Sequence, residues 1–155
     1  MSLASGVAVQ DECVETFNKL RMTGGQKGSK LKFIIMKITD NKKEVAVEDA
    51  SEDTDYEVFL NKITSAKDSQ GRPLPRYAVY DVEYDLGGGE GTRSKILFIS
   101  WVPSETPTLW SMLYASTREV VKNALNLTNS IHADDPAEIS WNALLKEASG
   151  GKAGK

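Results

Sequence analysis

The most regular hydrophobic pattern in the chain lies between Pro107 and Leu127. Apolar residues recur there every three or four positions, which predicts a long amphipathic helix. Its buried side is expected to hold Trp110, Leu113, Tyr114, Thr117, Val120, Val121, Ala124 and Leu125. Its opposite side is expected to hold Ser111, Met112, Ala115, Ser116, Glu119, Lys122, Asn123 and Asn126. Met112 is either a core residue at the helix edge or, because methionine adapts to irregular surfaces, part of a contact surface.

The rest of the chain alternates between strand patterns and shorter helical patterns. Residues 1–9 are small and apolar without periodicity, and they predict a flexible arm. A helix is expected from Asp11, with Cys13, Val14, Phe17, Leu20 and Arg21 on one face. The further expected elements are strands Leu31–Thr39 and Glu44–Asp49, a helix carrying Tyr56, Phe59, Leu60 and Ile63, a loop Ser65–Pro75, strands Arg76–Leu86 and Thr92–Val102, a strand Asn129–Ala133 and a helix Pro136–Ala148.

Several local signals set the ends of these elements. Asp55 or Thr54 is a plausible N-cap for the second helix. The glycines of Gly87–Gly91 can supply the positive φ that a tight strand connection needs. Apolar residues in succession at Ile96–Ile99 indicate a strand covered on both faces. The order α-ββ-α-ββ-α-β-α therefore predicts an α/β (α+β) fold, with a mixed five- to six-stranded sheet flanked by helices on both faces.

Composition places the chain among ordinary globular domains. It has 155 residues, of which 40% are hydrophobic and 26% are charged. This length predicts one domain at residues 5–148, with flexible tails at 1–4 and 149–155. The net charge of −3 indicates no general affinity for polyanions such as nucleic acids, so an acidic partner would need a local basic patch. With no long apolar run and a single cysteine, Cys13, we expect no stable membrane insertion and a reducing, cytoplasmic location.

Candidate chemistry is sparse. One cysteine and one histidine cannot supply a usual structural zinc site, so neither a metal nor a cofactor is expected. Gly24–Lys30 is glycine-rich, but it lacks the order and the following helix that a phosphate loop requires. Cys13 on an apolar helix face indicates a small core residue rather than a nucleophile. An enzyme hypothesis therefore has no residue to rest on, and a small hydrolase remains a remote alternative.

An ordered set of short segments resembles the ADF/cofilin family of actin-binding proteins. The matching segments are Ser5–Val9 (SGVAV), Arg76–Asp81 (RYAVYD), Glu90–Gly91, Arg93–Ile96 (RSKI), Phe98–Trp101 (FISW), Pro103, Met112–Ser116 (MLYAS) and Ala137–Ser140 (AEIS). They occur in the family's order over residues 5–147, and the fungal cofilins are the most similar in character. The resemblance implies the ADF-homology fold, in agreement with the element order above.

The resemblance also implies a function and a set of contact residues. It implies a non-enzymatic monomer that binds actin filaments and ADP-actin monomers, severs and depolymerises filaments, and acts at cortical actin patches in the cytoplasm and in the nucleus. A coactosin-like protein that decorates filaments or sequesters monomers without efficient severing is the alternative. The implied actin contacts are Ser5, Gly6, Val7, Arg93, Lys95, Ser111, Met112, Ala115, Ser116 and Lys122, with Ser5 as a regulatory phosphorylation site.

Several positions depart from the family pattern, including the reversed pair Lys146-Glu147 and Gly150 where an arginine is expected. Relatives usually carry basic residues just before the MLYAS segment, whereas this chain has Leu109 and Ser111. The resemblance implies phosphoinositide binding as well, a property that relies on such basic patches. We therefore expect Met112, Arg93 and Lys95 to carry a larger share of the actin affinity than in relatives.

Overall fold

The computed structural model describes residues 6–22, 31–85, 89 and 91–149. The predicted contact Ser5, the Gly24–Lys30 segment and residues 150–155 lie outside the described residues. The elements are β1 (Ala8–Val9), α1 (Asp11–Met22), β2 (Phe33–Ile38), β3 (Glu44–Ser51), α2 (Tyr56–Thr64), β4 (Arg76–Asp85), β5 (Thr92–Trp101), α3 (Thr108–Ala124), β6 (Ser130–Ala133), the 3-10 helix η1 (Pro136–Ile139) and α4 (Trp141–Ser149).

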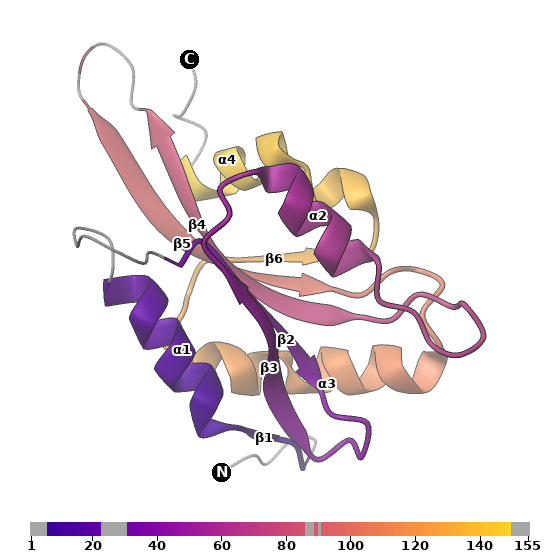
Figure 1. Ribbon diagram of the computed structural model, residues 1–155. Coiled ribbons are helices and arrows are strands. Elements are labelled where there is room, and N and C mark those ends of the chain that lie inside the picture. Colours follow the sequence, from indigo (N-terminus) through magenta and orange to yellow (C-terminus); the bar gives the residue numbers. More distant parts are fainter. Residues whose placement is uncertain (1–5, 23–30, 86–88, 90, 150–155) are drawn as a thin grey trace.

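The strands form one mixed sheet in the order β1-β3-β2-β4-β5-β6. The two outer pairs, β1 with β3 and β5 with β6, are parallel, and the inner pairs are antiparallel. Figure 1 shows α1 and α3 along one side of this sheet and α2 and α4 along the other. The predicted fold class, a mixed sheet with helices on both faces, is confirmed.

Each face of the sheet has its own hydrophobic core. One core joins β2, β4 and β5 to α1 and α3 through residues such as Phe17, Val79 and Val121. The other core joins the same strands to α2 and α4 through residues such as Phe59 and Leu144. In β5, Phe98 belongs to the first core, whereas its neighbours Leu97 and Ile99 belong to the second. Successive strand residues point to opposite faces, so the unbroken apolar run is confirmed as a strand covered on both sides.

The start of the chain differs from the prediction of a flexible arm. Ala8 and Val9 pair in parallel with Glu44 and Val45 of β3. The Ala8 amide donates to the Lys43 carbonyl at 3.0 Å. A strand of two residues carries no periodicity of its own, and its partner lies far away in the sequence. Local pattern therefore could not reveal it.

The helix ends show the expected capping chemistry with one correction. Asp55 caps α2 by accepting from the Glu57 amide, as predicted. The predicted last helix, Pro136–Ala148, is divided into η1 and α4. Ser140 between them has an extended backbone, and its Oγ accepts from the Ala143 amide at 3.2 Å. A serine N-cap begins a new helix there, because its side chain satisfies an amide that would otherwise lack a partner.

The long helix α3 is shorter at its end than the predicted Pro107–Leu127. Pro107 stands at its N-cap, where the missing proline N–H costs nothing. After the C-cap Leu125, Asn126 takes a φ of 57°. Asparagine tolerates this left-handed conformation, which stops the helix before Leu127.

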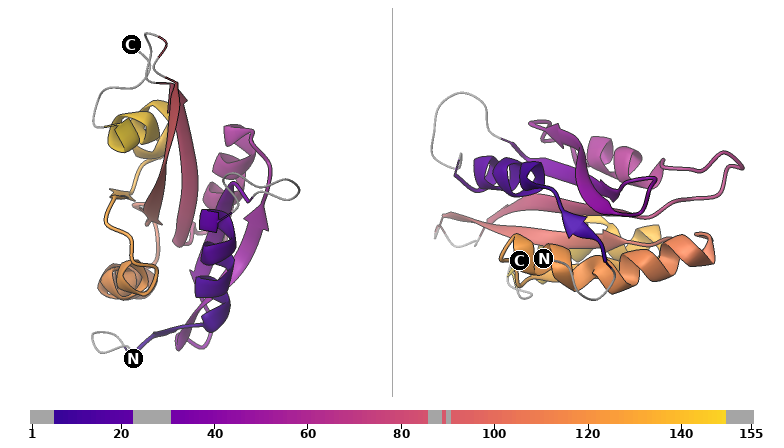
Figure 2. Two further views of the ribbon diagram at one scale, coloured as in Figure 1. Left: turned by 90° about the vertical axis from the view of Figure 1, so that its left-hand side faces the viewer. Right: turned by 90° about the horizontal axis from the view of Figure 1, so that it is seen from below.

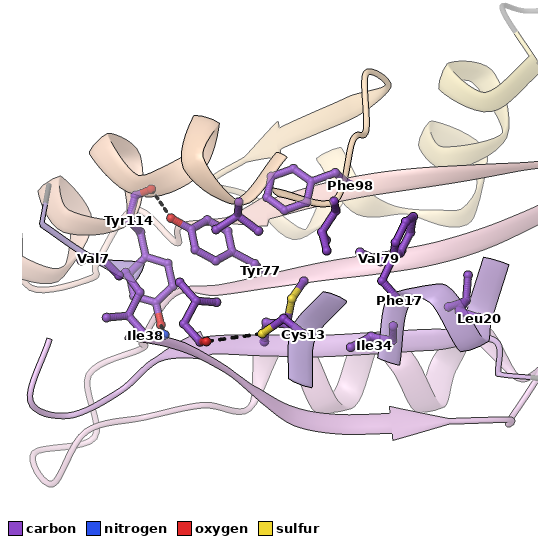
Figure 3. Close-up of a cluster of buried hydrophobic side chains, with 14 residues drawn as sticks. Val7, Cys13, Phe17, Leu20, Ile34, Ile38, Tyr77, Val79, Phe98 and Tyr114 are labelled. Atoms are coloured by element: carbon purple, nitrogen blue, oxygen red, sulfur yellow. Dashed lines mark hydrogen bonds between the residues drawn. The ribbon is translucent and has the colours of Figure 1, made fainter. Parts of the chain in front are cut away.

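The core on the α3 side contains a hydrogen-bonded tyrosine, Tyr114, shown in Figure 3. Its hydroxyl accepts from the Ile38 amide at 2.8 Å, and its own carbonyl accepts from the Tyr77 hydroxyl. Burial raises the pKa values of Tyr77 and Tyr114, which keeps both hydroxyls protonated. These bonds fix the position of α3 against β2 and β4.

Cys13 lies in the same core. Its thiol donates to the Val45 carbonyl at 3.3 Å, and burial, with a smaller contribution from Glu12, raises its pKa to about 12. A cysteine with so high a pKa stays protonated at neutral pH and is a poor nucleophile. Its predicted role as a core residue is confirmed.

We predict that Tyr114→Phe lowers the free energy of unfolding by about 1–3 kcal/mol, because the buried Ile38 amide loses its partner. Urea denaturation monitored by fluorescence measures the change. Tyr84→Phe is a matched control on a half-buried ring and should stay within about 0.5 kcal/mol of wild type. An equally small effect at Tyr114 would show that water replaces the bond.

Candidate functional site

The outward face of α3 carries an exposed apolar pair. Leu109 is 63% exposed and Met112 is 64% exposed, and they are the two large hydrophobic side chains exposed among the described residues. A spacing of three residues makes them neighbours on the helix. Ala115 and Ser116 continue this face and are also exposed. The prediction that Met112 lies on the surface is confirmed, and Leu109 enlarges the apolar area around it.

The opposite face of α3 holds this pair in place. Tyr114, Thr117 and Val121 are buried. Trp110 packs against the core from the helix edge, and the Lys42 ammonium lies 4.6 Å from the centre of its ring. This contact ties the β2–β3 turn to the first turns of α3. The helix is thus fixed along its length, and Leu109 and Met112 project from a rigid support.

The start of the described chain lies beside α3. β1 contacts α3, and Figure 2 shows the two elements next to each other. Gly6 is exposed with a φ of 76°, a conformation that favours glycine. Val7 was predicted to contact a partner, but its side chain is 0% exposed and packs in the core with Tyr114. Pairing of β1 with β3 draws Val7 inward, so the surface at this end begins at Gly6.

The predicted basic pair forms a second surface. Arg93 and Lys95 are exposed on β5, opposite Tyr84 and Val82 of β4. Strand alternation puts them on the sheet face that buries Leu97, which is the face opposite α3. Figure 1 shows this end of the β4–β5 hairpin projecting away from α3. The structure therefore divides the predicted contacts between two separate surfaces.

The other predicted residues on α3 are less accessible. The Lys122 side chain is only 15% exposed, with its Nζ 3.7 Å from the Glu119 carboxylate. Ser111 is half-buried. It lines a cavity beside the face that carries Met112.

That cavity brings together residues that sequence reasoning missed. Ser100 of β5 and His132 of β6 are register partners, and both line it together with Arg118 of α3. Burial lowers the pKa of His132, and the neighbouring cations Arg118 and Lys122 lower it further. Helical spacing places Ser111 and Arg118 on one side of α3. No local signal indicates that β5 and β6 pair in this register.

The described residues present surfaces suited to binding a partner. They contain no group of three or more histidine, cysteine, aspartate or glutamate side chains placed to hold a metal ion. Within the described part of the chain, no helix is long and apolar enough to cross a membrane. What the site presents is an apolar pair on a fixed helix and a cationic pair on a projecting hairpin.

Comparisons with known proteins identify relatives along nearly the whole chain. Residues 6–149 match the family described as cofilin/tropomyosin-type actin-binding protein. The chain is 38% identical to a cofilin of Gibberella zeae, over 96% of this chain and 97% of that protein. The crystal structure of Streptomyces griseoflavus cofilin superposes with a TM-score of 0.79 at 34% identity, covering 94% of this chain and 99% of that one. Human coactosin-like protein has the same fold, with a TM-score of 0.72 at 16% identity over 93% of this chain and 98% of that one.

We predict opposite stability effects for Met112 and Val7. Met112→Ala should stay within about 0.5 kcal/mol of wild type, because the side chain is largely in water already. Val7→Ala should cost about 2 kcal/mol, because it leaves a cavity in the core. Chemical denaturation of both variants measures the two changes. A large loss in Met112→Ala would contradict the assignment of the helix faces.

Proposed function

The chain belongs to the cofilin/ADF family of actin-binding proteins, and from this we propose that it binds actin monomers and filaments and severs the filaments. The observation that carries the proposal is the exposed Leu109–Met112 pair on α3. Large apolar side chains that a protein leaves adjacent and uncovered mark an interaction surface. The result of this binding is filament disassembly and actin turnover.

The α3 surface is the proposed contact with an actin monomer. It consists of Leu109, Met112, Ala115 and Ser116, with Gly6 beside it. The small side chains allow close approach of a partner, and methionine adjusts to the partner's shape. A standard protein interface buries about 800 Å² on each partner, and a few central residues supply most of its energy. We expect Met112 to be one of them.

Arg93 and Lys95 are the proposed contact with a second actin subunit in a filament. The chain has a net charge of −3, so attraction to an acidic partner must come from a local cationic group. These two cations lie on the sheet face opposite α3. One molecule could therefore touch two subunits at once, whereas a monomer would need only the α3 surface. This second contact should raise the affinity for filaments. Once the α3 surface is bound, the second contact forms within an existing complex, at a high effective concentration.

The proposed partner also implies an oligomeric state, a mode of action and a location in the cell. We propose a monomer that acts by binding rather than catalysis, at the actin cytoskeleton of the cytoplasm, including cortical patches, and in the nucleus. Phosphoinositide binding is proposed only as a weaker property, because Leu109 and Ser111 add no cation to the start of α3. Actin contacts by Ser5 and Lys122 remain predictions.

We predict that the pure protein pellets with actin filaments and shortens them at sub-stoichiometric ratios. Co-sedimentation and fluorescence imaging of filament lengths measure both effects. Met112→Glu should nearly abolish binding, because it places a carboxylate in the apolar contact. Asn61→Glu, with the same charge change on exposed α2, is the control and should bind normally. Pelleting without shortening would support the coactosin-like alternative, and failure to pellet at low salt would contradict actin binding.

A second prediction concerns regulation at Ser5. Phosphorylation adds about −1.5 to −2 charges, which an acidic partner disfavours and an interface must desolvate. Ser5 precedes Val7 by two residues in the sequence, and Val7 packs in the core with Tyr114 of α3. Ser5→Glu should weaken actin binding while the midpoint of thermal unfolding stays unchanged. Severing equal to wild type would show that Ser5 is not at the interface.

A third prediction concerns the two missing basic residues. Leu109→Arg with Ser111→Lys should tighten monomer binding several-fold at low salt, because each exposed ion pair contributes about 0.2–1 kcal/mol. The gain should disappear as salt is raised, because screening weakens it. Glu15→Lys on exposed α1 changes the net charge equally and should show little gain. If Glu15→Lys tightened binding equally, the effect would come from the change in net charge and not from the positions of the new cations.

A further inference from the structure

The turn between β2 and β3 brings a lysine to the start of α3. The Lys42 ammonium lies 4.6 Å from the centre of the Trp110 ring. Trp110 stands between Leu109 and Ser111 in the first turn of this helix. Lys42 is half-buried, so it is held against the ring while part of it stays accessible to solvent. The fold thus places a cation next to the helix turn that carries the exposed Leu109 side chain.

Hydrogen bonds hold this turn in place. The Lys42 amide donates to the Thr39 carbonyl at 2.8 Å. Asn41 Oδ1 accepts from the Lys43 amide at 3.0 Å. The turn is also bonded to β1, because the Ala8 amide donates to the Lys43 carbonyl. Through these bonds and the Trp110 contact, the turn is attached to β1 and to α3, the two elements that border the proposed monomer contact.

The backbone conformation of Lys42 indicates that its side chain has a role. Its φ is 65°, in the left-handed region that favours glycine and asparagine. Among the described residues, Lys42 and Asn126 are the two other than glycine with a positive φ. Asn126 is of a type that tolerates this region, whereas lysine is not. Residues held in such conformations gather at functional sites, so the choice of lysine here calls for a reason.

A structural link between the turn and α3 does not require a charge. An apolar side chain would pack against the Trp110 ring without the cost of desolvating an ammonium. A charge is needed, however, if this end of α3 meets an acidic surface. The helix carries no charged side chain from Thr108 to Thr117, and the whole chain has a net charge of −3. Lys42 is a cation that tertiary structure adds where α3 has none.

We propose that the β2–β3 turn is a further segment of the monomer-binding surface, and that Lys42 pairs there with a carboxylate of the bound actin. This inference rests on the proposed function, because Lys42 reaches actin only if the α3 surface faces it. The Trp110 ring orients the ammonium, and the carboxylate approaches its accessible side. Lys42 thereby supplies from a neighbouring turn a charge that Leu109 and Ser111 do not supply.

The physics of an accessible ion pair sets the size of the effect. Such a pair contributes modestly and weakens as salt is raised. A charge at the edge of an interface acts mainly on the rate of association, because it guides the approach of the partner. One cation at this edge leaves monomer binding less dependent on salt than filament binding, to which Arg93 and Lys95 are proposed to add.

Stopped-flow binding of the full chain to fluorescently labelled ADP-actin monomers, at several salt concentrations, tests the proposal. Lys42→Gln should lower the association rate and the affinity about two- to fivefold at low salt. The difference from wild type should disappear at high salt, because screening removes it. Lys42→Arg keeps the charge and the contact with the ring, so it should bind like wild type. Lys19→Gln on exposed α1 removes the same charge and should have little effect.

A glycine variant separates binding from folding. Glycine suits a φ of 65° better than glutamine does, and neither residue carries an ammonium. Lys42→Gly should therefore unfold at a higher urea concentration than Lys42→Gln, and yet bind actin equally weakly at low salt. If affinity followed stability in these two variants, Lys42 would only link the turn to α3, and the proposal would be wrong.

The outcomes distinguish this inference from the proposed function. If the wild-type chain binds no actin monomer, actin binding itself is contradicted and the role of Lys42 falls with it. If wild type binds and Lys42→Gln binds equally well at low salt, the role of Lys42 alone is overturned. A loss that persists at high salt would overturn it too, because an ion pair weakens under screening. Equal weakening by Lys19→Gln would assign the effect to net charge and overturn the proposed location.

Discussion

The anchoring of α3 through Tyr114 is the interaction on which the functional surface depends. Its hydroxyl is bonded to the backbone of β2, and its carbonyl accepts from Tyr77 of β4. One residue thus fixes the helix to two central strands, in a core that excludes competing water (Figure 3). The rotation of α3 about its axis follows from this attachment. Leu109 and Met112 therefore point outward because the polar bonds of Tyr114 and the buried face of α3 hold the helix in place.

The two proposed actin surfaces rely on different physics. The Leu109–Met112 pair gains from removing apolar area from water, which salt affects little. Arg93 and Lys95 act through charge, which salt screens and which mainly aids encounter and orientation. Because relatives usually place cations at the start of the long helix and this chain has Leu109 and Ser111, monomer binding should depend on salt less than filament binding does.

The cavity beside α3 is built by long-range contacts, because α3, β5, β6 and η1 all contribute residues to its lining. Ser100 Oγ and Arg118 Nε are buried without a hydrogen-bond partner among the described residues, which costs stability. Around them, the carboxylate of Glu138 is fixed by backbone amides of the turn before η1. Ser111 lines this cavity, whereas Met112 is exposed on the neighbouring face, so the single helix α3 contributes to both regions.

The sequence alone determined the features that depend on local chemistry. Helical spacing identified the buried side of α3 at Tyr114, Thr117 and Val121, but Ala124, which was expected on that side, is exposed near the end of the helix. Alternation put Arg93 and Lys95 on one face, and Asp55 marked the start of α2. Long-range pairing decided the rest. Val7 was expected in an exposed arm, but the pairing of β1 with β3 buries it. Ser100 lies beside His132 because β5 and β6 pair in a parallel register that the sequence does not reveal. The break at Ser140 was missed because a serine within a helical pattern becomes a cap only when the chain turns there. Local periodicity records which side of an element is apolar, but the partner that covers that side is chosen by packing between residues distant in sequence.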